Sequence, residues 1–126
     1  MNGVKLLLDT NFIIGLVKGN VQVANLLQDR SINLEQCAYS FITRIELLSY
    51  PTITDAEVRA ITSILNAMEY LPMTQTIEDM TIKIRRQYKL KTPDAIIAAT
   101  VKVMSLELLT LDQQLANRMM EILAGT

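Results

Sequence analysis

Histidine is absent from this chain of 126 residues, and cysteine occurs only once, as Cys37. Without histidine there is no Ser-His-Asp triad, no Cys-His dyad, no histidine-based ribonuclease site and no His-ligated zinc site. One cysteine forms neither an intrachain disulfide nor a zinc cluster, so the composition does not mark a disulfide-stabilised secreted domain. Any chemistry must come from carboxylates, hydroxyls, Lys or Arg side chains, or a hard metal ion.

Long apolar runs and an excess of one charge are missing as well. Runs such as Leu6–Leu8 are far shorter than the ~18–20 residues of a membrane span, and Lys5 and Asp9 enclose no signal-peptide core. We therefore expect a cytoplasmic protein without a membrane segment. Because 12 Lys and Arg residues meet 13 Asp and Glu residues, the net charge is −1. Binding to a polyanion must then rest on a local patch of positive charge.

The composition is that of a globular protein, with 50% hydrophobic residues. The length fits one domain over residues 1–126, large enough to bury roughly two-thirds of its unfolded surface. No repeat and no linker rich in Pro, Gly or Ser divides it. So high an apolar content also suggests a partner or dimer interface, because monomers rarely expose large apolar patches.

Short apolar runs alternate with segments of helical periodicity along the whole chain. We expect strands at residues 4–8, 38–42, 69–71 and 107–111, and helices at 12–17, 21–27, 43–49, 54–67, 77–88, 92–104 and from about 113. Thr43 with Glu46 and Thr54 with Glu57 match the Thr-x-x-Glu capping box, and Thr92 precedes a proline as a helix cap would. This order predicts an α/β fold, a three-layer α/β/α sandwich with a mostly parallel sheet of four to five strands.

Four acidic residues fall at one edge of this predicted sheet. Asp9 ends the first strand, Glu46 lies in the first turn of the next helix, Asp94 opens the helix before the fourth strand, and Asp112 follows that strand. Open parallel sheets bind ligands at this carboxyl edge. Four carboxylates repel one another unless a cation compensates them, and a site made only of oxygen ligands favours Mg²⁺ or Mn²⁺ over zinc. Such an ion activates water for phosphodiester hydrolysis without a histidine base.

Each acid also has a purely structural interpretation. Glu46 would complete the capping box of Thr43, and Asp94 would complement a helix N-terminus. Asp9 and Asp112 are well placed to cap the helices that follow them. Convergence favours the functional interpretation, because four independent caps have no reason to share one edge of one sheet.

In four blocks the sequence resembles the PIN-domain nucleases, and among them the VapC-type toxins of type II toxin–antitoxin pairs. The blocks are residues 6–11 (LLLDTN), 43–46 (TRIE), 92–100 (TPDAIIAAT) and 109–112 (LTLD). Their order and spacing hold over nearly the whole chain. The sequence departs from the family after Asp112, where Gln113 and Gln114 stand in place of a further acid and an aromatic residue. The C-terminal strand usual in the family is also short or missing.

The resemblance implies that Asp9, Glu46, Asp94 and Asp112 form the catalytic, metal-binding quartet of a Mg²⁺- or Mn²⁺-dependent endoribonuclease. It also implies that Thr10, Asn11, Thr43 and Thr110 orient the metal ligands or water. Members of the family are usually homodimers, held inactive by a cognate antitoxin protein whose tail enters the acidic groove. The expected function is hydrolysis of RNA phosphodiester bonds by the toxin of such a pair.

A cluster of positive charge precedes Asp94. Five cations fall within residues 83–91: Lys83, Arg85, Arg86, Lys89 and Lys91. On a helix, Arg85, Arg86 and Lys89 lie near one another, so the cluster is a candidate for contact with RNA phosphates, as is Arg44. The alternative is a solvated helix end whose cations complement the helix dipole.

Three other functions compete with a nuclease. A PIN-like domain with weak or no activity would act as an RNA- or protein-binding module, against which the intact quartet argues. A receiver-type phosphoacceptor domain needs an Asp after the third strand, but that strand ends in Leu71 and Pro72. A haloacid-dehalogenase phosphatase needs Asp-x-Asp after the first strand, where this chain has Asp9-Thr10-Asn11.

Overall fold

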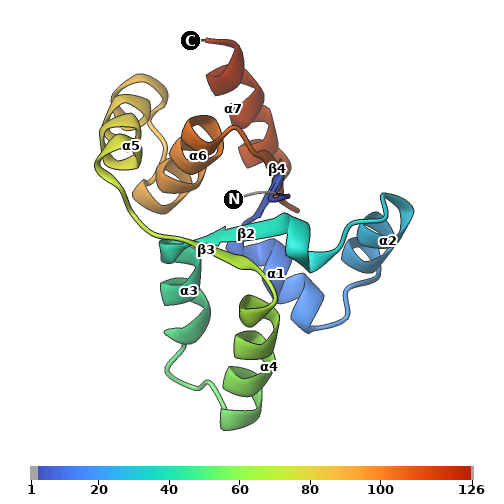
Figure 1. Ribbon diagram of the computed structural model, residues 1–126. Coiled ribbons are helices and arrows are strands. Elements are labelled where there is room, and N and C mark those ends of the chain that lie inside the picture. Colours follow the sequence, from blue (N-terminus) through green and yellow to red (C-terminus); the bar gives the residue numbers. More distant parts are fainter. Residues whose placement is uncertain (1–2, 126) are drawn as a thin grey trace.

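A computed structural model describes residues 3–125 of the chain (Figure 1). Within this range four strands form one sheet in the order β3-β2-β1-β4, and every neighbouring pair is parallel. The strands are β1 (Leu6–Leu8), β2 (Cys37–Ser40), β3 (Glu69–Leu71) and β4 (Glu107–Leu109). The helices are α1 (Thr10–Val17), α2 (Val21–Asp29), the short 3₁₀ helix η1 (Leu34–Gln36), α3 (Phe41–Leu48), α4 (Asp55–Asn66), α5 (Gln75–Tyr88), α6 (Thr92–Met104) and α7 (Gln113–Ala124).

Helices cover both faces of the sheet. Because side chains alternate along a strand, Leu7 packs among α5, α6 and α7, whereas Leu6 and Leu8 pack among α1 to α4. Figure 1 shows these two groups of helices on opposite sides of the strands. Burial of Leu7 and Leu8 is complete, which stabilises the fold by about 1.5–3 kcal/mol for each side chain. The predicted three-layer α/β/α sandwich is therefore confirmed, with four strands and no fifth in residues 3–125.

The path of the chain creates a switch point in the sheet. From β1 the chain moves outward through β2 to β3, with α1 to α4 on one face. It then crosses to the other face through α5 and α6 and returns as β4 on the opposite side of β1. In open parallel sheets, ligands bind at the carboxyl ends of the strands where the order reverses in this way. Here that place lies beyond the ends of β1 and β4.

The second strand ends earlier than predicted, and the capping box assigned to Thr43 is wrong. Ser40 is the N-cap of α3, and its hydroxyl accepts a hydrogen bond from the N–H of Ile42 at 3.2 Å. Thr43 is fully buried inside the helix, and Glu46 lies in the second turn rather than the first. The serine two residues before Ile42 competes successfully with the Thr-x-x-Glu pattern because it stands directly at the end of the paired strand.

Two other predicted helix starts have different outcomes. The capping box of α4 is confirmed, since the N–H of Glu57 donates to Thr54 Oγ1 at 3.1 Å and the N–H of Thr54 donates to Glu57 Oε1 at 3.0 Å. Thr92 is not a cap: it is the first residue of α6, and Lys91 occupies the N-cap position. Asp94 still lies in the first turn of α6, as predicted.

Strands β1 and β4 are shorter than the predicted ranges, with three paired residues each. Both end where a side chain begins to cap the next helix: Asp9 caps α1 and Asp112 caps α7. The last backbone link between them joins the N–H of Asp9 to the carbonyl of Leu109 at 3.2 Å. Beyond this point the polar side chains of both segments are free to form a pocket.

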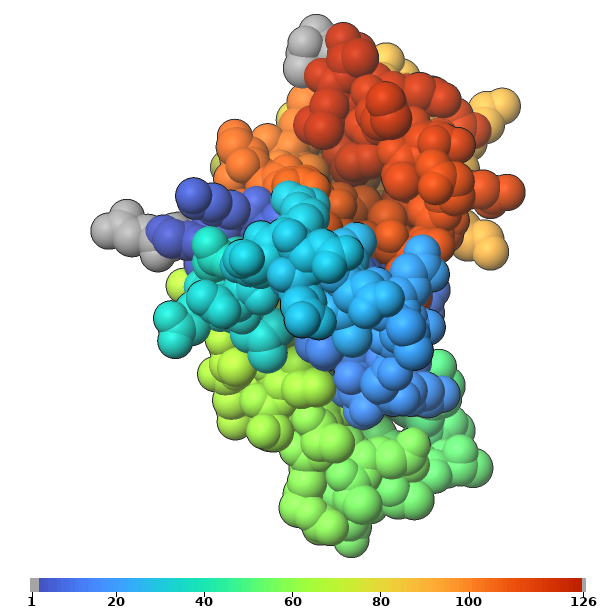
Figure 2. Space-filling view, turned by 90° about the vertical axis from the view of Figure 1, so that its right-hand side faces the viewer, coloured from blue at the N-terminus to red at the C-terminus, as the bar shows by residue number. Residues whose placement is uncertain are grey.

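Helices of both layers contribute to the molecular surface. Figure 2 shows one face of the molecule, with α7 (red) above, the segment from α2 to β2 (blue to cyan) across the middle and the region of α4 (green) below. Of the helices in residues 3–125, none combines the length and the hydropathy that a membrane span requires.

Candidate active site

A polar pocket of about 190 Å³ opens at the switch point of the sheet. Its lining includes all four predicted acids and two of their predicted neighbours: Asp9, Thr10, Asn11, Glu46, Asp94 and Asp112. The acids come from four elements, namely the end of β1, the second turn of α3, the first turn of α6 and the cap of α7. The tertiary fold brings them together, because no two of them are neighbours in the sequence. We call this the acidic pocket.

Asp9 is the most buried of the four acids, with 5% of its surface exposed. Its Oδ1 accepts a hydrogen bond from the N–H of Phe12 at 2.9 Å, which caps α1, and its Oδ2 accepts one from the Thr110 hydroxyl. Burial raises the pKa of Asp9 above its ordinary value, and the nearby charges of Asp112 and Asp94 add to the rise. The hydrogen bonds from Thr110 and Phe12 oppose it by stabilising the ionised carboxylate.

Thr110 links two of the acids. Its hydroxyl donates to Asp9 and accepts a hydrogen bond from the backbone N–H of Asp112 at 3.0 Å. Asp112 Oδ1 in turn accepts from the N–H groups of Gln114 and Leu115, at 2.9 and 3.2 Å, and so caps α7. The capping interpretations of Asp9 and Asp112 are thus correct. They do not compete with a role in the pocket, because the caps also hold both carboxylates in place.

A second set of hydrogen bonds ties α1 to α3. The hydroxyl of Thr10 donates to Glu46 Oε1 at 2.6 Å, and it lies 3.2 Å from the hydroxyl oxygen of Thr43. Thr43 is completely buried and Glu46 is half-buried. The threonines therefore fix the direction in which Glu46 faces the acidic pocket.

Asp94 lies near charged side chains of both signs, which change its pKa. Burial raises its pKa above the ordinary value, and the carboxylates of Asp112 and Glu46 raise it further. Lys91, three residues before it, opposes the rise. Together with Asp9, this residue shows that negative charge in the pocket is only partly compensated by the protein itself.

The donor set fits a hard divalent cation by its chemistry. Carboxylate and hydroxyl oxygens are the ligands that Mg²⁺ and Mn²⁺ prefer. A cation would offset the burial and the smaller carboxylate repulsion that raise the pKa values of Asp9 and Asp94. As the side chains stand, no group of three acidic or cysteine residues within residues 3–125 is arranged to hold one ion. Metal binding would thus require side-chain adjustment, which the half-buried and exposed acids can make.

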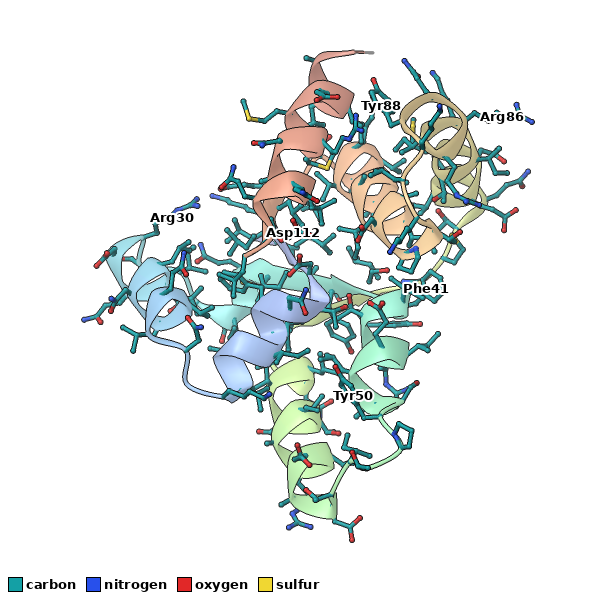
Figure 3. All side chains as sticks on the ribbon, turned by 180° about the vertical axis from the view of Figure 1, so that it is seen from behind. Arg30, Phe41, Tyr50, Arg86, Tyr88 and Asp112 are labelled. Atoms are coloured by element: carbon teal, nitrogen blue, oxygen red, sulfur yellow. The ribbon has the colours of Figure 1, made fainter. Side chains whose placement is uncertain are left out.

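The predicted RNA-contacting cations do not form one surface. Lys89 ends α5 in the left-handed conformation, with φ at 56°, so it does not continue the helical face of Arg85 and Arg86. Arg85 Nε donates to the carbonyl of Leu90 at 3.2 Å. Figure 3 shows Arg86 projecting from α5 on the side of the molecule away from Asp112. Lys83 is likewise exposed on α5.

Arg44 also faces away from the pocket. It precedes Glu46 by two positions on α3, and residues at that spacing leave a helix on nearly opposite sides. Its charge acts on Tyr39, whose pKa burial raises and Arg44 lowers. Arg44 is therefore separated from the acidic pocket by the body of α3.

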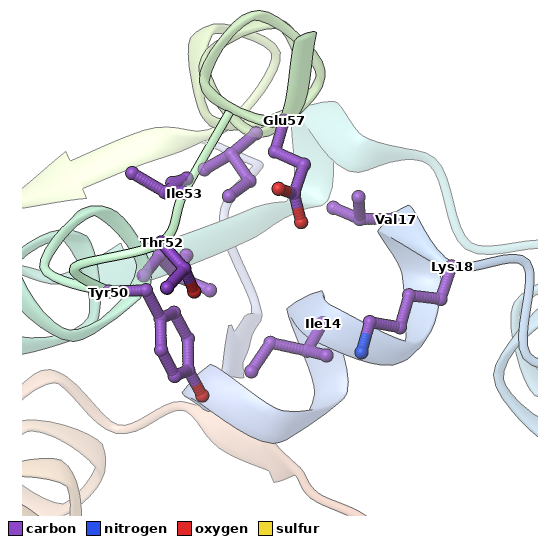
Figure 4. Close-up of a pocket in the computed structure, with 9 residues that line it drawn as sticks. Ile14, Val17, Lys18, Tyr50, Thr52, Ile53 and Glu57 are labelled. Atoms are coloured by element: carbon purple, nitrogen blue, oxygen red, sulfur yellow. The ribbon is translucent and has the colours of Figure 1, made fainter. Parts of the chain in front are cut away.

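Sequence reasoning missed two neighbouring hollows. One is an apolar pocket of about 500 Å³ between α1, α3 and α4, drawn in Figure 4. It shares Ile14 and Tyr50 with the acidic pocket, while Lys18 and Glu57 face each other across it. No local pattern marks Tyr50, which follows α3 and is 57% exposed.

The other missed hollow is a polar pocket of about 620 Å³ on the far side of Asp94 and Asp112. Residues of α7 at helical spacing line it, among them Gln114, Asn117 and Arg118. That spacing of polar residues after a capping Asp was the available signal. We call this hollow the basic pocket after Lys89, Lys91 and Arg118; its wall also contains the acids Asp94, Asp112 and Glu121.

Comparison with known proteins identifies a matching family and solved structures of similar fold. A family model described as PIN domain matches residues 6–118. A toxin–antitoxin complex from Klebsiella pneumoniae is 32% identical, with a TM-score of 0.75 over 87% of this chain and 88% of that one. FitAcB from Neisseria gonorrhoeae is 28% identical, with a TM-score of 0.75 over 90% and 92% of the two chains.

A third structure shares the fold at lower identity. VapBC2 from Rickettsia felis, bound to a DNA fragment from its promoter, is 17% identical, with a TM-score of 0.76 over 90% of this chain and 92% of that one. At this identity the likeness concerns the fold alone. No curated protein sequence matches the chain.

Proposed function

The chain belongs to the PIN domain family, and from this premise we propose that it is a Mg²⁺- or Mn²⁺-dependent endoribonuclease and the toxin of a toxin–antitoxin pair. PIN domains are generally nucleases, and the solved structure at 32% identity is a toxin–antitoxin complex from Klebsiella pneumoniae. The proposal covers residues 1–126 as a single nuclease domain. Action on RNA would place the protein in the cytoplasm.

One observation carries the proposal: four acids from four separate elements line a single pocket at the switch point of the sheet. Folded proteins rarely gather like charges without a purpose, because each carboxylate disfavours ionisation of the others. Burial is the main cause of the raised pKa values of Asp9 and Asp94, and the neighbouring carboxylates add to the rise. The place matches the ligand-binding edge of parallel sheets in general.

Asp9, Glu46, Asp94 and Asp112 would hold the metal. When bound, a Mg²⁺ or Mn²⁺ ion supplies activated water and neutralises charge that develops on a phosphodiester during hydrolysis. The protein then needs no histidine base, which agrees with a chain that has none.

The neighbouring hydroxyls have positioning roles in this proposal. Thr110 keeps the Oδ2 of Asp9 occupied by a donor and thus favours the ionised carboxylate. Thr10 and Thr43 orient Glu46, while Asn11 contributes to the pocket wall. Such partners outside the ligand set commonly change activity by about 10- to 100-fold when they are removed.

We place the antitoxin contact along the acidic pocket and the apolar pocket beside it. The two share Ile14 and Tyr50, so a segment with an apolar anchor and a polar end fits them together. A polypeptide in this position would cover the acids and exclude RNA. This partner is inferred from the similar structure from Klebsiella pneumoniae, which is a toxin–antitoxin complex.

A homodimer is the second assembly that we propose. Large apolar side chains are exposed on several elements, including Ile45, Ile82, Met120 and Leu123. Exposed apolar surface of this kind often marks a protein interface. Light scattering of the purified chain, alone and with its antitoxin, measures this state directly.

The test of the function is cleavage of single-stranded RNA in Mg²⁺ and Mn²⁺ by the parent chain and three variants. Asp9→Asn and Asp94→Asn keep size and polarity but remove a negative ligand, so we expect cleavage to fall on the order of a hundredfold or more. Asp79→Asn is the matched control, because Asp79 is exposed on α5, and it should cleave like the parent. Equal rates for all four proteins would refute the role of the quartet.

The same assay distinguishes a nuclease from the remaining alternative, a domain without nuclease activity. A PIN-like domain that binds RNA or protein without cleaving would bind labelled RNA yet leave it intact at every metal concentration. Growth arrest on induction, relieved by Asp9→Asn, would distinguish a toxin from a nuclease without toxicity.

A further inference from the structure

The basic pocket adjoins the acidic pocket along one wall. Both are lined by Asp94, Asp112 and Leu115, so they lie next to each other at the start of α6 and α7. The linker between α5 and α6 supplies Lys89 and Lys91, and α7 supplies Arg118. Three cations therefore stand beside the acids that would carry out cleavage.

This arrangement matters because the whole chain offers no attraction to a polyanion. At a net charge of −1, an RNA must find its positive partners locally. Lys91 is the N-cap of α6, Asp94 lies in the first turn of that helix, and both line the basic pocket. A phosphate held by Lys91 would thus lie close to the acidic pocket.

We propose that the basic pocket binds an RNA phosphate next to the bond that is cleaved, through Lys89, Lys91 and Arg118. The proposal rests on the proposed function, which it deepens by assigning the path of the substrate. The side-chain amides of Gln114 and Asn117, on the same wall, are suited to hydrogen-bond the sugar or the phosphate. The three cations are positioning residues, since none lies among the acids of the acidic pocket.

Arg118 is available for this role despite its ion pair. Its Nη1 lies 3.2 Å from Glu121 Oε2, and both side chains are about half exposed. Pairs of this kind contribute about 0–1 kcal/mol, whereas a phosphate accepts two parallel hydrogen bonds from a guanidinium. RNA would therefore replace Glu121 as the partner of Arg118.

The cations of α5 lie away from the basic pocket that we assign to the RNA phosphate. Arg86 projects from α5 on the side away from Asp112 (Figure 3), and Lys83 lies one helical turn before it on the same helix. They offer a control with the same residue types, the same exposed class of side chain and the same change in net charge.

The first test compares two double variants in the Asp9→Asn background, which prevents cleavage during the measurement. Binding of a fluorescein-labelled single-stranded RNA is followed by anisotropy at several salt concentrations. For Lys91→Gln with Arg118→Gln we expect Kd to rise on the order of tenfold, and the slope of log Kd against log salt to fall by about 1 to 1.5. Lys83→Gln with Arg86→Gln should change Kd less than twofold and leave the slope unaltered.

The second test is a gain of affinity, which a misfolded variant cannot imitate. Glu121→Gln releases Arg118 and removes a negative charge from the basic pocket, so it should lower Kd by about two- to fourfold. Glu78→Gln, the same change on α5, should have no effect. In the active protein, Arg118→Gln should raise KM for RNA while kcat stays near the parent value.

The outcomes are distinguishable. If the parent cleaves RNA and the two double variants bind alike, the basic pocket is not a site, while the proposed function stands. A larger loss in the α5 variant would direct the RNA over α5 and also overturn the pocket. If the parent neither binds nor cleaves RNA, the proposed function fails, and the assignment of this pocket fails with it.

Discussion

Thr110 is the residue on which the geometry of the acidic pocket depends most. One hydroxyl group donates to Asp9 and accepts from the backbone of Asp112, so the ends of β1 and β4 are joined by a side chain after their backbone pairing stops. A valine of the same shape would leave the exposed N–H of Asp112 and the buried carboxylate of Asp9 without this partner. The resemblance of residues 109–112 to the PIN-domain pattern made a positioning role for Thr110 predictable.

The four acids could be predicted from where each single residue stands in the sequence. Asp and Glu at a strand end or a helix start are visible in the sequence, and the parallel topology then places them at one edge. Lys91 and Arg118 were not predicted to share a pocket, because their proximity depends on how α6 packs against α7. No local pattern encodes that distance.

Cys37 provides a prediction at the same scale. It is completely buried in β2, and burial raises the pKa of its thiol to about 11 from an ordinary value of 9.0. Because only the thiolate reacts, we expect iodoacetamide at pH 8 to alkylate the folded protein at least about a hundredfold more slowly than the urea-unfolded chain. Mass spectrometry of timed samples measures both rates. Similar rates would mean that β2 opens readily or that the thiol is accessible.

At the scale of elements, the helices were predicted better than their first residues. The periodic apolar positions of α4 and α5 indicate their existence, because each helix buries one face. Helix α6 is instead buried over seven consecutive residues, Ala95–Val101, and its start is indicated by Pro93 and Asp94. The start of α3 was wrong because two capping patterns compete, and Ser40 at the strand end prevails over Thr43. Such choices depend on where the strand stops, which is a tertiary property.

Gly15 provides a prediction for the packing of α1 on α2. A Cβ at this position would lie 2.9 Å from Val23 Cγ2 and 3.4 Å from Leu111 Cδ1. Gly15→Ala therefore gains about 1 kcal/mol of helix propensity but loses more to overpacking, with a net fall in the free energy of unfolding of about 1–2 kcal/mol. Urea denaturation measures the change.

Val23→Ala supplies the control for this interpretation. It removes the methyl groups that the new Cβ would meet, so the double variant should be more stable than the sum of the two single effects by about 1 kcal/mol. Strictly additive effects would show that the cost of Gly15→Ala does not arise from the contact with Val23.

At the scale of the whole molecule, the layers were predicted, whereas the order of the strands was not. Alternating strands and helices indicate a parallel sheet covered on both faces. That β4 returns beside β1, and not beside β3, is decided by which helices can pack on the second face. This placement creates the switch point, and with it the contact between Thr110 and Asp9.

Metal binding should be visible in the stability of the molecule. The pKa values of Asp9 and Asp94 are raised in the folded protein, so their contribution to stability is favourable below the ordinary value of 3.8 and is lost as pH rises through the folded values. At neutral pH both ionised groups thus destabilise the fold. With Mg²⁺ or Mn²⁺ at ten times its Kd, we expect the Tm to rise on the order of 5 °C, from about 1.4 kcal/mol of binding free energy.

The dependence on the acids makes this prediction specific. Asp9→Asn should reduce the shift in Tm, whereas Asp79→Asn should keep it in full, because Asp79 is exposed on α5. Differential scanning calorimetry with EDTA as the metal-free reference measures both. A Tm indifferent to both metals in the parent would argue against a cation in the acidic pocket.

The acidic pocket joins residue 9 to residue 112 through one hydroxyl, and this has a consequence for the order of synthesis. While a ribosome is still making α5, the nascent chain already holds Asp9 and Glu46 but has no Asp94 and no Asp112 to complete the lining. The pocket is assembled only once α7 has emerged and its cap has formed. A cell that makes this chain therefore meets an incomplete site throughout most of translation, and a break in the chain between α3 and α6 separates the two halves of the site.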